Sequence, residues 1–228
     1  MPAFHTLRLG LCPYAEGLTR QEKFLAERGP TDPDLLILLQ HPAVITLGRR
    51  SGSDSLLLPT ETLRQRLGIE IFPAARGGET TFHGPGQLVG YPLVNLTPLG
   101  RDLHRFVFLL EQTLLDTLGH FGVEGERIAG RTGVWVQGKK IASIGIGVRR
   151  WISWHGFSLN VGSNLDGFRH IVPCGQPDTE MTALSLLLER EISPKEVEEP
   201  LIASFSRNFD TRYLGEYEPA SPTQTRLA

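Results

Sequence analysis

Hydrophobic residues recur along this 228-residue chain with helical spacing in some segments and in short continuous runs in others. Residues 14–28 predict a helix, because their apolar side chains fall on one face and a Gly-Pro pair follows. The runs 35–39 and 43–47 are typical of well-covered strands. A short helix at 59–67 and a strand at 69–72 come next, so the first third of the chain is expected to mix both element types.

The middle of the chain predicts a strand, a long helix and an antiparallel meander. Residues 88–96 form the expected strand, and Asp102 is placed to cap an amphipathic helix that two nearby glycines end. The β-rich runs 133–136, 140–148 and 151–161 are joined by tight turns. These three runs are therefore expected to pair in sequence order.

The C-terminal part predicts one more helix and then a tail. Residues 193–196 combine a capping box with proline at the first helical position, and we expect this helix to reach about residue 209 with a disturbance at Pro200. Residues 217–228 are mostly polar or turn-forming, so one domain, 1–216, and a loose tail are expected. Helices and strands do not alternate regularly. This favours an α/β fold of the α+β type, with a mixed, largely antiparallel sheet flanked by helices, over a doubly wound parallel sheet.

Composition narrows the class of protein. A net charge of −2 provides no overall basic surface for nucleic acid. The longest apolar runs are too short to cross a membrane, and the N-terminal residues lack a signal-peptide pattern. Cys12 and Cys174 are the two cysteines, and they form neither a disulfide framework nor a paired zinc motif. We therefore expect a protein of the reducing cytoplasm.

Cys174 stands between a proline and a glycine, a setting that predicts a thiol displayed on a rigid turn. Lys140, 34 residues earlier, begins a predicted strand, in which regular alternation places it on one face with Ala142 and Ile144. A nearby ammonium would favour the thiolate of Cys174, which is the form that attacks carbonyl carbon. The alternative is that Lys140 snorkels at a strand end.

Three other kinds of site are alternatives to this pair: a cysteine with a histidine base, a zinc site and a serine hydrolase. His170, His155 and His83 are available as bases for the cysteine, and His170, Cys174 and His83 could ligate zinc, although they lack the close paired spacing of strong zinc motifs. No GxSxG elbow occurs, which disfavours a serine hydrolase. Lys140 and Cys174 remain the favoured pair.

The segment 76–87 is rich in glycine and favours a loop that cradles a substrate over an ordinary connection. Its glycines let backbone N–H groups approach a ligand, and Arg76 and His83 add polar side chains. Gly84-Pro85-Gly86 supplies two glycines of GxGxxG, but Val89 occupies the third position. A dinucleotide site is therefore disfavoured.

These motifs together resemble the lipoyl(octanoyl) transferase family of the biotin/lipoate protein ligase fold superfamily. The segment 76–87 is similar to the family's RGG-x-x-T-Y-HGPGQ signature. Further blocks match in order over roughly residues 30–190: Gly90-Tyr91-Pro92-Leu93, Thr132 to Val136, Lys140 to Gly145, His155 to Val161 and Ile171 to Gly175. Two departures are Phe82 in place of the usual tyrosine, and Gln176-Pro177 after Gly175 in place of isoleucine.

The resemblance implies a fold like the biotin/lipoate protein ligase catalytic domain and transfer of an octanoyl group from octanoyl-acyl carrier protein to a lysine of lipoyl domains. It implies that Cys174 forms an acyl-thioester intermediate and that Lys140 lowers the pKa of this thiol. The implied substrate-binding residues are Arg76, Gly77, Gly78, Glu79, Thr80, Thr81, Phe82, His83, Ser143, Ile144, Gly145, Gly156, Phe157 and Ser158.

The implied reaction is the first step of endogenous protein lipoylation, and it needs no cofactor or metal. The implied acceptors are lipoyl domains of 2-oxoacid dehydrogenases and the glycine cleavage H protein, with no nucleic acid and no membrane as partner. Small residues, Ala142, Gly145 and Gly156, are expected to leave room for the eight-carbon chain.

The resemblance also implies that both protein partners are acidic, so basic residues either dock them or are ordinary solvated surface. The candidates are Arg49, Arg50, Arg149 and Arg150. Two alternatives stay open: an ATP-dependent lipoate or biotin protein ligase on the same fold, and a non-catalytic module that binds lipoyl domains. The ligase has no need for a covalent cysteine, and the binding module has no need for either Cys174 or Lys140.

Overall fold

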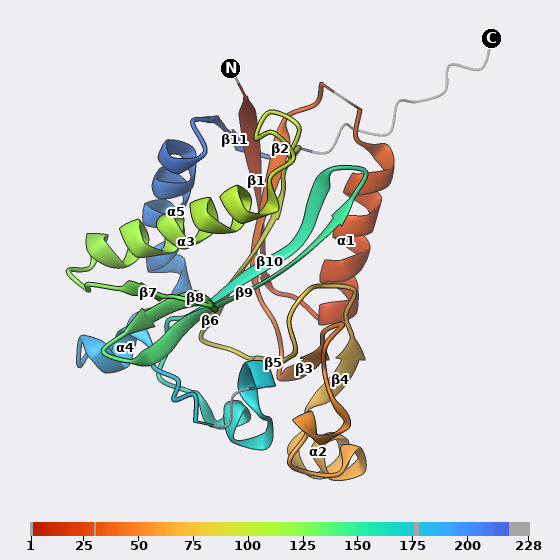
Figure 1. The fold of residues 1–228 in the computed structure, drawn as a ribbon, viewed down its shortest axis with the longest axis vertical. Coiled ribbons are helices and arrows are strands. Elements are labelled where there is room, and N and C mark those ends of the chain that lie inside the picture. Colours follow the sequence, from red (N-terminus) through yellow and green to blue (C-terminus); the bar gives the residue numbers. More distant parts are fainter. Residues whose placement is uncertain (1, 30, 176–177, 219–228) are drawn as a thin grey trace.

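The computed structural model describes residues 2–29, 31–175 and 178–218 of the chain. An eight-stranded mixed sheet runs through the molecule (Figure 1). In spatial order its strands are β11 (Arg212–Glu216), β1 (Ala3–Leu11), β2 (Asp34–Gln40), β6 (Gln87–Leu93), β10 (Ile152–Asn160), β9 (Lys139–Arg149), β8 (Arg131–Val136) and β7 (Glu126–Ile128). Only the pairs β11–β1 and β1–β2 are parallel, and the other five are antiparallel. The expected mixed, largely antiparallel sheet is confirmed.

A smaller three-stranded sheet lies at the lower right of Figure 1. It contains β4 (Glu70–Pro73), β3 (Val44–Leu47) and β5 (Thr80–His83). β3 pairs with β4 in parallel and with β5 in antiparallel fashion. The prediction that the whole glycine-rich segment is a loop is wrong for β5. Pairing with β3 makes these four residues a strand, and the glycines occupy the turns on either side.

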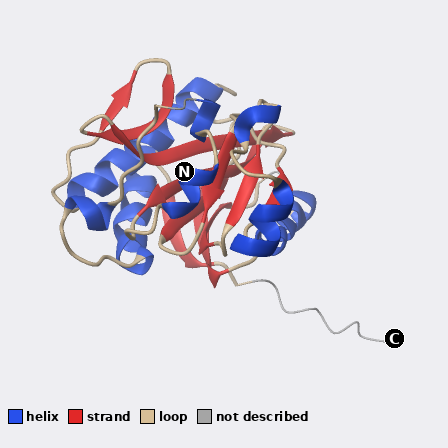
Figure 2. Cartoon of the chain, turned by 90° about the horizontal axis from the view of Figure 1, so that it is seen from below, coloured by secondary structure: helices blue, strands red, loops and turns tan. Residues whose placement is uncertain are grey.

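Helices cover both faces of the large sheet (Figures 1 and 2). The helices are α1 (Tyr14–Glu27), α2 (Thr60–Leu67), α3 (Leu103–His120), α4 (Leu184–Leu187) and α5 (Pro194–Asn208), and three 3₁₀ turns are η1 (Ser53–Ser55), η2 (Asp166–His170) and η3 (Pro173–Gly175). α3 and α5 pack together over one face, and α1 lies on the other. Among the described residues, no helix is both long and apolar enough to cross a membrane.

The long helix α3 forms where helical spacing predicted it. Asp102 caps it, because its Oδ1 accepts a hydrogen bond from the backbone N–H of Arg105 at 3.0 Å. The apolar face of α3 is fully buried at Phe106, Leu110 and Leu114. Each such side chain contributes about 1.5–3 kcal/mol through burial. This packing is what fixes the helix against the sheet.

Helix α5 begins at the predicted capping box but is not disturbed at Pro200. Oε1 of Glu196 accepts hydrogen bonds from the backbone N–H of Ser193 at 2.8 Å and from its hydroxyl at 3.0 Å. The predicted disturbance is wrong, since the helix continues through Pro200 to Asn208. A proline inside a helix costs about 3 kcal/mol. Burial of the apolar face, including Leu201 and Phe205, offsets that cost.

Three strands, β1, β7 and β11, have no clear signal in the sequence. β1 lies between β2 and β11, and β7 has only three residues at the sheet edge. Of the expected tail 217–228, residues 219–228 lie outside the described part of the chain. Tyr217 packs on the domain: its N–H donates to the carbonyl of Thr6, and its ring contacts those of His5 and Phe24.

Candidate active site

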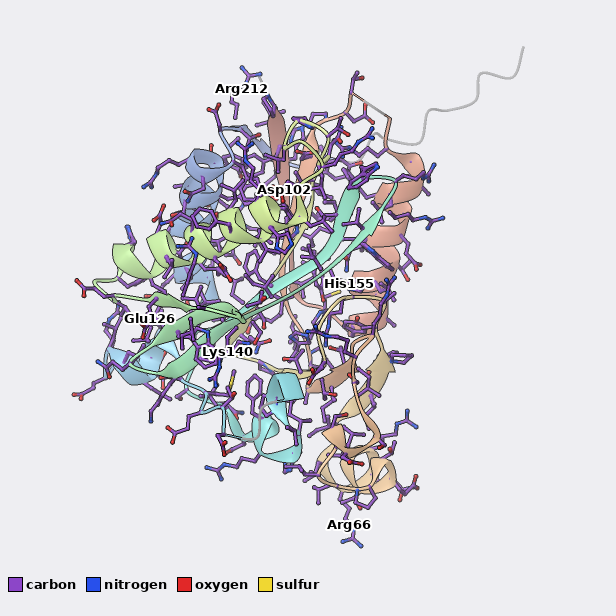
Figure 3. The ribbon with its side chains drawn as sticks, viewed as in Figure 1. Arg66, Asp102, Glu126, Lys140, His155 and Arg212 are labelled. Carbon is purple, nitrogen blue, oxygen red and sulfur yellow. The ribbon has the colours of Figure 1, made fainter. Side chains whose placement is uncertain are left out.

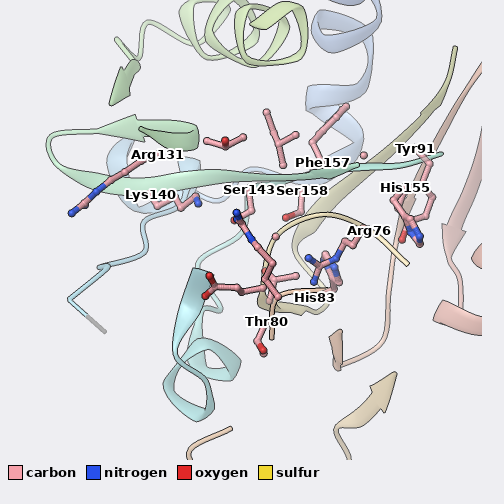
Figure 4. A pocket seen from close by; sticks show the side chains of 18 of the residues that line it. Arg76, Thr80, His83, Tyr91, Arg131, Lys140, Ser143, His155, Phe157 and Ser158 are labelled. Atoms are coloured by element: carbon pink, nitrogen blue, oxygen red, sulfur yellow. The ribbon is translucent and has the colours of Figure 1, made fainter. Parts of the chain in front are cut away.

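A pocket opens between the long strands β9 and β10 on one side and the segment 76–83 on the other (Figure 4). Most of the residues predicted to bind substrate line it. These are Arg76, Gly78, Glu79, Thr80, Thr81, His83, Ser143, Ile144, Gly145, Gly156, Phe157 and Ser158. Lys140 lines the same pocket. Three blocks that are far apart in sequence therefore meet around one cavity.

Strand pairing brings two of these blocks together. In the β9–β10 hairpin, Ser143 pairs with Ser158, Ile144 with Phe157, and Gly145 with Gly156. The third block lies over this hairpin, because the N–H of Gly77 donates to the carbonyl of Ile146 at 2.8 Å. The pocket is thus bounded by backbone that is held by hydrogen bonds on both sides.

Two glycines of the hairpin, Gly145 and Gly156, line the pocket and also allow neighbouring segments to pack closely. A Cβ atom on Gly145 would lie 2.9 Å from Cδ of Arg76, so glycine at this position lets the segment 76–83 approach β9. A Cβ on Gly156 would collide with the carbonyl oxygen of Gly90 in β6. Ala142 belongs to the large apolar core and does not line the pocket. Its predicted role beside the acyl chain is therefore replaced by a role in core packing.

Arg76 holds the glycine-rich segment in place and puts a positive charge beside the pocket. Its side chain is buried, with Nη2 donating to the carbonyl of Thr46 at 2.9 Å and to the Thr46 hydroxyl at 2.7 Å. Nη1 donates to the carbonyl of Gly77 at 3.1 Å. These bonds join the segment to β3.

Two residues of the predicted set do not line the pocket. Gly77 contributes its backbone bond to β9, and Phe82 turns the other way. The Phe82 ring packs with Phe168 at a centroid separation of 5.6 Å, in an apolar cluster that includes Ile45. The ring therefore takes part in packing on the side away from the pocket.

Lys140 lies on the pocket side because the β8–β9 ladder contains an irregularity. Val134 pairs with Ala142 while Trp135 pairs with Lys140, so Ile141 is one residue extra on β9. Ile141 and Ala142 consequently both belong to the large core. The predicted regular face of Lys140, Ala142 and Ile144 is wrong for this reason: the extra residue moves Lys140 to the face of the pocket.

The Lys140 side chain is only 3% exposed. Its ammonium lies 5.3 Å from the centroid of the Trp135 ring, within the range of a cation–π interaction. Its backbone N–H donates to the carbonyl of Glu180 at 2.8 Å, and its carbonyl accepts from the N–H of Thr182 at 2.9 Å. The segment that follows Cys174 in sequence therefore runs alongside Lys140.

The backbone of Cys174 lies in η3, which packs against β5. Gly175 adopts a φ of +65°, and a Cβ atom on it would collide with the Glu79 carboxylate. Since Glu79 lines the pocket, the turn that carries Cys174 borders on it. The side chain of Cys174 lies outside the described part of the structure. Contact between Cys174 and Lys140 stays a prediction.

The end of the pocket away from Lys140 is lined by buried polar rings (Figures 3 and 4). His83 and His155 lie there with Tyr91, and Nε2 of His41 bonds the Tyr91 hydroxyl at 2.7 Å. Burial lowers the pKa of His83 to about 3 and those of His41 and His155 to about 4. These rings are neutral at pH 7 and can act as hydrogen-bonding groups.

The other sequence candidates are more dispersed. His170 lies in η2 and does not line the pocket, whereas His83 is buried with its Nδ1 2.6 Å from Oε1 of Gln87. In the described part of the chain, no group of three or more His, Cys, Asp and Glu side chains is arranged to hold a metal ion. Cys12 is buried in the apolar cluster that includes Leu25 of α1.

Several pocket residues had not been assigned a role from sequence. Trp135, Tyr91 and Arg131 line the pocket, as does Tyr14 at the start of α1. Tyr91 and Trp135 occur inside the family-like blocks, which was the available signal for them. Tyr14 and Arg131 carry no such signal, because only the packing of α1 and of the β7–β8 turn brings them to the cavity.

Sequence comparison places this chain among proteins of lipoylation. The family profile described as the lipoyl protein ligase A/B catalytic domain matches residues 13–206. The chain is similar to an octanoyltransferase from Solibacter usitatus, with 47% identity over 91% of this chain and 93% of the relative. It is also similar to an octanoyltransferase from Geobacter metallireducens, with 43% identity over 93% of this chain and 97% of the relative.

Solved structures show the same fold. A putative lipoate protein ligase from T. acidophilum, Ta0514, superposes with a TM-score of 0.79 at 14% identity, covering 96% of this chain and 90% of that one. A biotin protein ligase from Aquifex aeolicus, in complex with biotin and ATP, gives a TM-score of 0.54 at 15% identity over 92% of this chain and 71% of that one. The expected likeness to lipoate and biotin ligase catalytic domains is confirmed at the level of the fold.

Proposed function

The chain belongs to the family of lipoyl protein ligase A/B catalytic domains, and because its curated relatives are octanoyltransferases, we propose that its reaction proceeds through a thioester on Cys174. The chain is an acyltransferase that transfers octanoyl groups in protein lipoylation, as the curated relatives with 43–47% identity indicate. In this proposal the donor is octanoyl-acyl carrier protein. The acceptors are lysines of lipoyl domains, in 2-oxoacid dehydrogenases and in the glycine cleavage H protein.

The proposed first step forms the thioester on the enzyme. The Cys174 thiolate attacks the carbonyl carbon of the donor thioester, and the bond from that carbon to the carrier sulfur breaks. The carrier thiolate takes a proton from the Lys140 ammonium as it leaves. An ammonium beside Cys174 also lowers the pKa of the thiol, so the attacking thiolate is present at neutral pH.

The proposed second step forms the amide. The neutral amine of the acceptor lysine attacks the enzyme thioester, the carbon–sulfur bond breaks, and Cys174 returns as thiolate. The proton lost by the amine goes to Lys140, which is thereby restored as an ammonium. No ATP is consumed, because the thioester already carries the acyl group in activated form.

The observation that supports this proposal most directly is the buried Lys140 side chain at one end of a pocket built from the family's sequence blocks. Burial of a lysine is costly unless the site stabilises the ammonium, and the Trp135 ring does so here. The turn that carries Cys174 borders the same pocket through Gly175 and Glu79. In the proposal, the Cys174 thiol reaches this ammonium, which is the arrangement that favours a thiolate for thioester exchange.

Mass spectrometry of the intact protein tests the thioester. After mixing with octanoyl-acyl carrier protein without ATP, we expect the mass to rise by one octanoyl group. The adduct should be lost on treatment with hydroxylamine and on addition of a lipoyl domain. Cys174→Ala is the matched variant and should gain no mass. A wild-type protein without an adduct, or an adduct that persists in Cys174→Ala, contradicts the proposal.

Further measurements test the role of Lys140 and distinguish the transferase from a ligase and from a non-catalytic binding module. Lys140→Met should slow thioester formation and shift the pH profile of Cys174 alkylation by iodoacetamide to higher pH, and an unchanged profile contradicts the pairing. A ligase would octanoylate the lipoyl domain from free octanoate only when ATP is added. A non-catalytic module would bind the lipoyl domain without changing its mass.

A further inference from the structure

Two arginines line the pocket near the residues proposed for catalysis: Arg131 lies at the end that holds Lys140, and the backbone of Arg50 is bonded to Gly78, next to Glu79 beside the turn of Cys174. Arg50 and Arg131 both line the pocket, and both are exposed. Within residues 2–29, 31–175 and 178–218, neither side chain forms a salt bridge. By contrast, the neighbouring Lys139 is paired with Glu180 at 2.8 Å. Of the Lys and Arg residues that line the pocket, Arg50 and Arg131 are thus the exposed ones, and no described carboxylate is paired with them, whereas Arg76 and Lys140 are buried.

The two arginines come from opposite walls. Arg50 follows β3, and its backbone N–H donates to the carbonyl of Gly78 at 3.1 Å, which ties it to the glycine-rich segment. Arg131 begins β8, and its guanidinium lies 5.6 Å from the Trp135 ring centroid. Figure 4 shows Arg131 at the same end as Lys140 and opposite His155. We define Arg50 and Arg131 as the mouth arginines.

The other basic pair proposed from sequence is remote from this mouth. Arg149 and Arg150 lie at the turn of the β9–β10 hairpin, whereas Lys140 lies at the other end of β9. Eight residues of strand lie between Lys140 and Arg149, which corresponds to a separation of about 30 Å. A partner that presents a short side chain to Lys140 would contact the mouth arginines long before it reached this turn.

We propose that the mouth arginines dock the acceptor domain by binding carboxylates that flank its target lysine. This inference rests on the proposed function. The acceptor amine stands on the four-carbon stem of one lysine side chain, so the body of the acceptor must come close to the pocket for the amine to enter. The donor acyl group stands on the long phosphopantetheine arm, so the body of the carrier protein can remain farther away.

Electrostatics supports an acidic acceptor surface. Exposed arginines that have no internal partner attract carboxylates and repel other cations over about 8 Å at physiological salt. The target lysine is itself a cation, and the same arginines disfavour its charged form as it approaches. Acidic residues beside that lysine would hold the acceptor on the arginines while the amine loses its proton and attacks the thioester.

Binding of an unmodified lipoyl domain to the full-length protein tests the docking without requiring any chemistry. We expect Arg50→Glu/Arg131→Glu to raise the Kd at least tenfold at 0.1 M salt, and the difference to shrink at 0.5 M. Arg50→Lys/Arg131→Lys should bind close to wild type. A lipoyl domain whose flanking acidic residues are replaced by lysine should bind the doubly reversed variant better than the wild type.

Arg66→Glu/Arg105→Glu is the matched control, because both residues are exposed, form no salt bridge within the described residues and do not line the pocket; Figure 3 shows Arg66 at the lower tip of the molecule. An unchanged Kd in the mouth variant overturns the docking proposal. It is also overturned if Arg149→Glu/Arg150→Glu raises the Kd as much, or if the mouth variant weakens only octanoyl-carrier binding.

Acylation of Cys174 by octanoyl-pantetheine is measured separately from docking. Failure of this acylation contradicts the proposed thioester and leaves the docking proposal to the binding experiment.

Discussion

His155 adopts a positive φ of 53° inside β10, a conformation that few residues other than glycine adopt. Its backbone N–H donates to Oε1 of Gln21 in α1 at 2.7 Å, and its ring is 2% exposed. This bond from a helix to a strand holds His155 toward the pocket. Burial, together with the smaller effect of the Arg76 and Arg49 charges, lowers the pKa of His155 to about 4.

The lowered pKa values predict that the protein loses stability as the pH falls. Unfolded histidine has a pKa of about 6.5, so between that pH and about 4 the unfolded state binds more protons than the folded state. Stability is full above pH 6.5 and decreases through this window by about 1.4 kcal/mol per pH unit for each buried histidine. His155, His41 and His83 all act in this direction.

His155→Asn removes the contribution of one histidine to this pH dependence, because asparagine tolerates positive φ and does not titrate. We expect the slope of unfolding free energy against pH, measured by urea unfolding between pH 4.5 and 6, to be shallower than in wild type by about 1.4 kcal/mol per unit. An unchanged slope would show that His155 does not remain neutral in the folded protein.

At the scale of elements, the pocket depends on how closely β10 approaches β6. Gly156 of β10 pairs with Gly145 of β9, and a Cβ atom on Gly156 would lie 2.5 Å from Cδ of Pro92 and would collide with the carbonyl of Gly90. Both obstacles belong to backbone or to a proline ring, neither of which can turn aside. The strands can therefore sit at this spacing only when glycine occupies position 156.

Gly156→Ala should destabilise the protein by about 1–3 kcal/mol, the usual cost of overpacking. Gly119→Ala is the matched control, since Gly119 lies in α3 with nothing within 4 Å of an added Cβ. That control should stabilise by about 0.4–1 kcal/mol. Thermal unfolding of both variants measures the contrast. Equal melting temperatures would show that the β6–β10 spacing relaxes at little cost.

At the scale of the whole molecule, one side chain joins the two ends of the described chain. Arg8 of β1 bonds Glu198 at 2.9 Å and Glu199 at 2.5 Å in α5, and it also bonds Glu216 in β11. The Arg8 side chain is 27% exposed. The network therefore holds the parallel edge of the sheet to the helix layer.

Arg8→Met should lower the free energy of unfolding by about 1–2 kcal/mol, between the values for exposed and for buried pairs. The loss should be smaller at high salt, because this network is partly exposed. Lys23→Met breaks an exposed pair with Glu27 at 3.9 Å within one helix and should change stability by less than about 0.5 kcal/mol. Urea unfolding of both variants at two salt concentrations measures the loss of unfolding free energy. Equal losses in Arg8→Met and Lys23→Met would contradict a structural role for the network.

The sequence by itself determined the parts of this protein that depend on short-range patterns. Helical spacing and capping residues predicted α1, α3 and α5, and tight turns predicted the meander of β8, β9 and β10. The motif blocks predicted the family and most of the pocket lining, because their residues act from fixed places on neighbouring strands.

The tertiary structure alone decided the features that depend on which segments pair. β1 becomes a strand through its pairing with β2 and β11, and β11 through its pairing with β1; the extra residue Ile141 in the β8–β9 ladder turns Lys140 toward the pocket. Packing of separate elements also brings Arg131 and Arg50 to the same pocket. The physical reason is common to these cases: a side chain's face follows from the register of its partner strand, which no local pattern encodes.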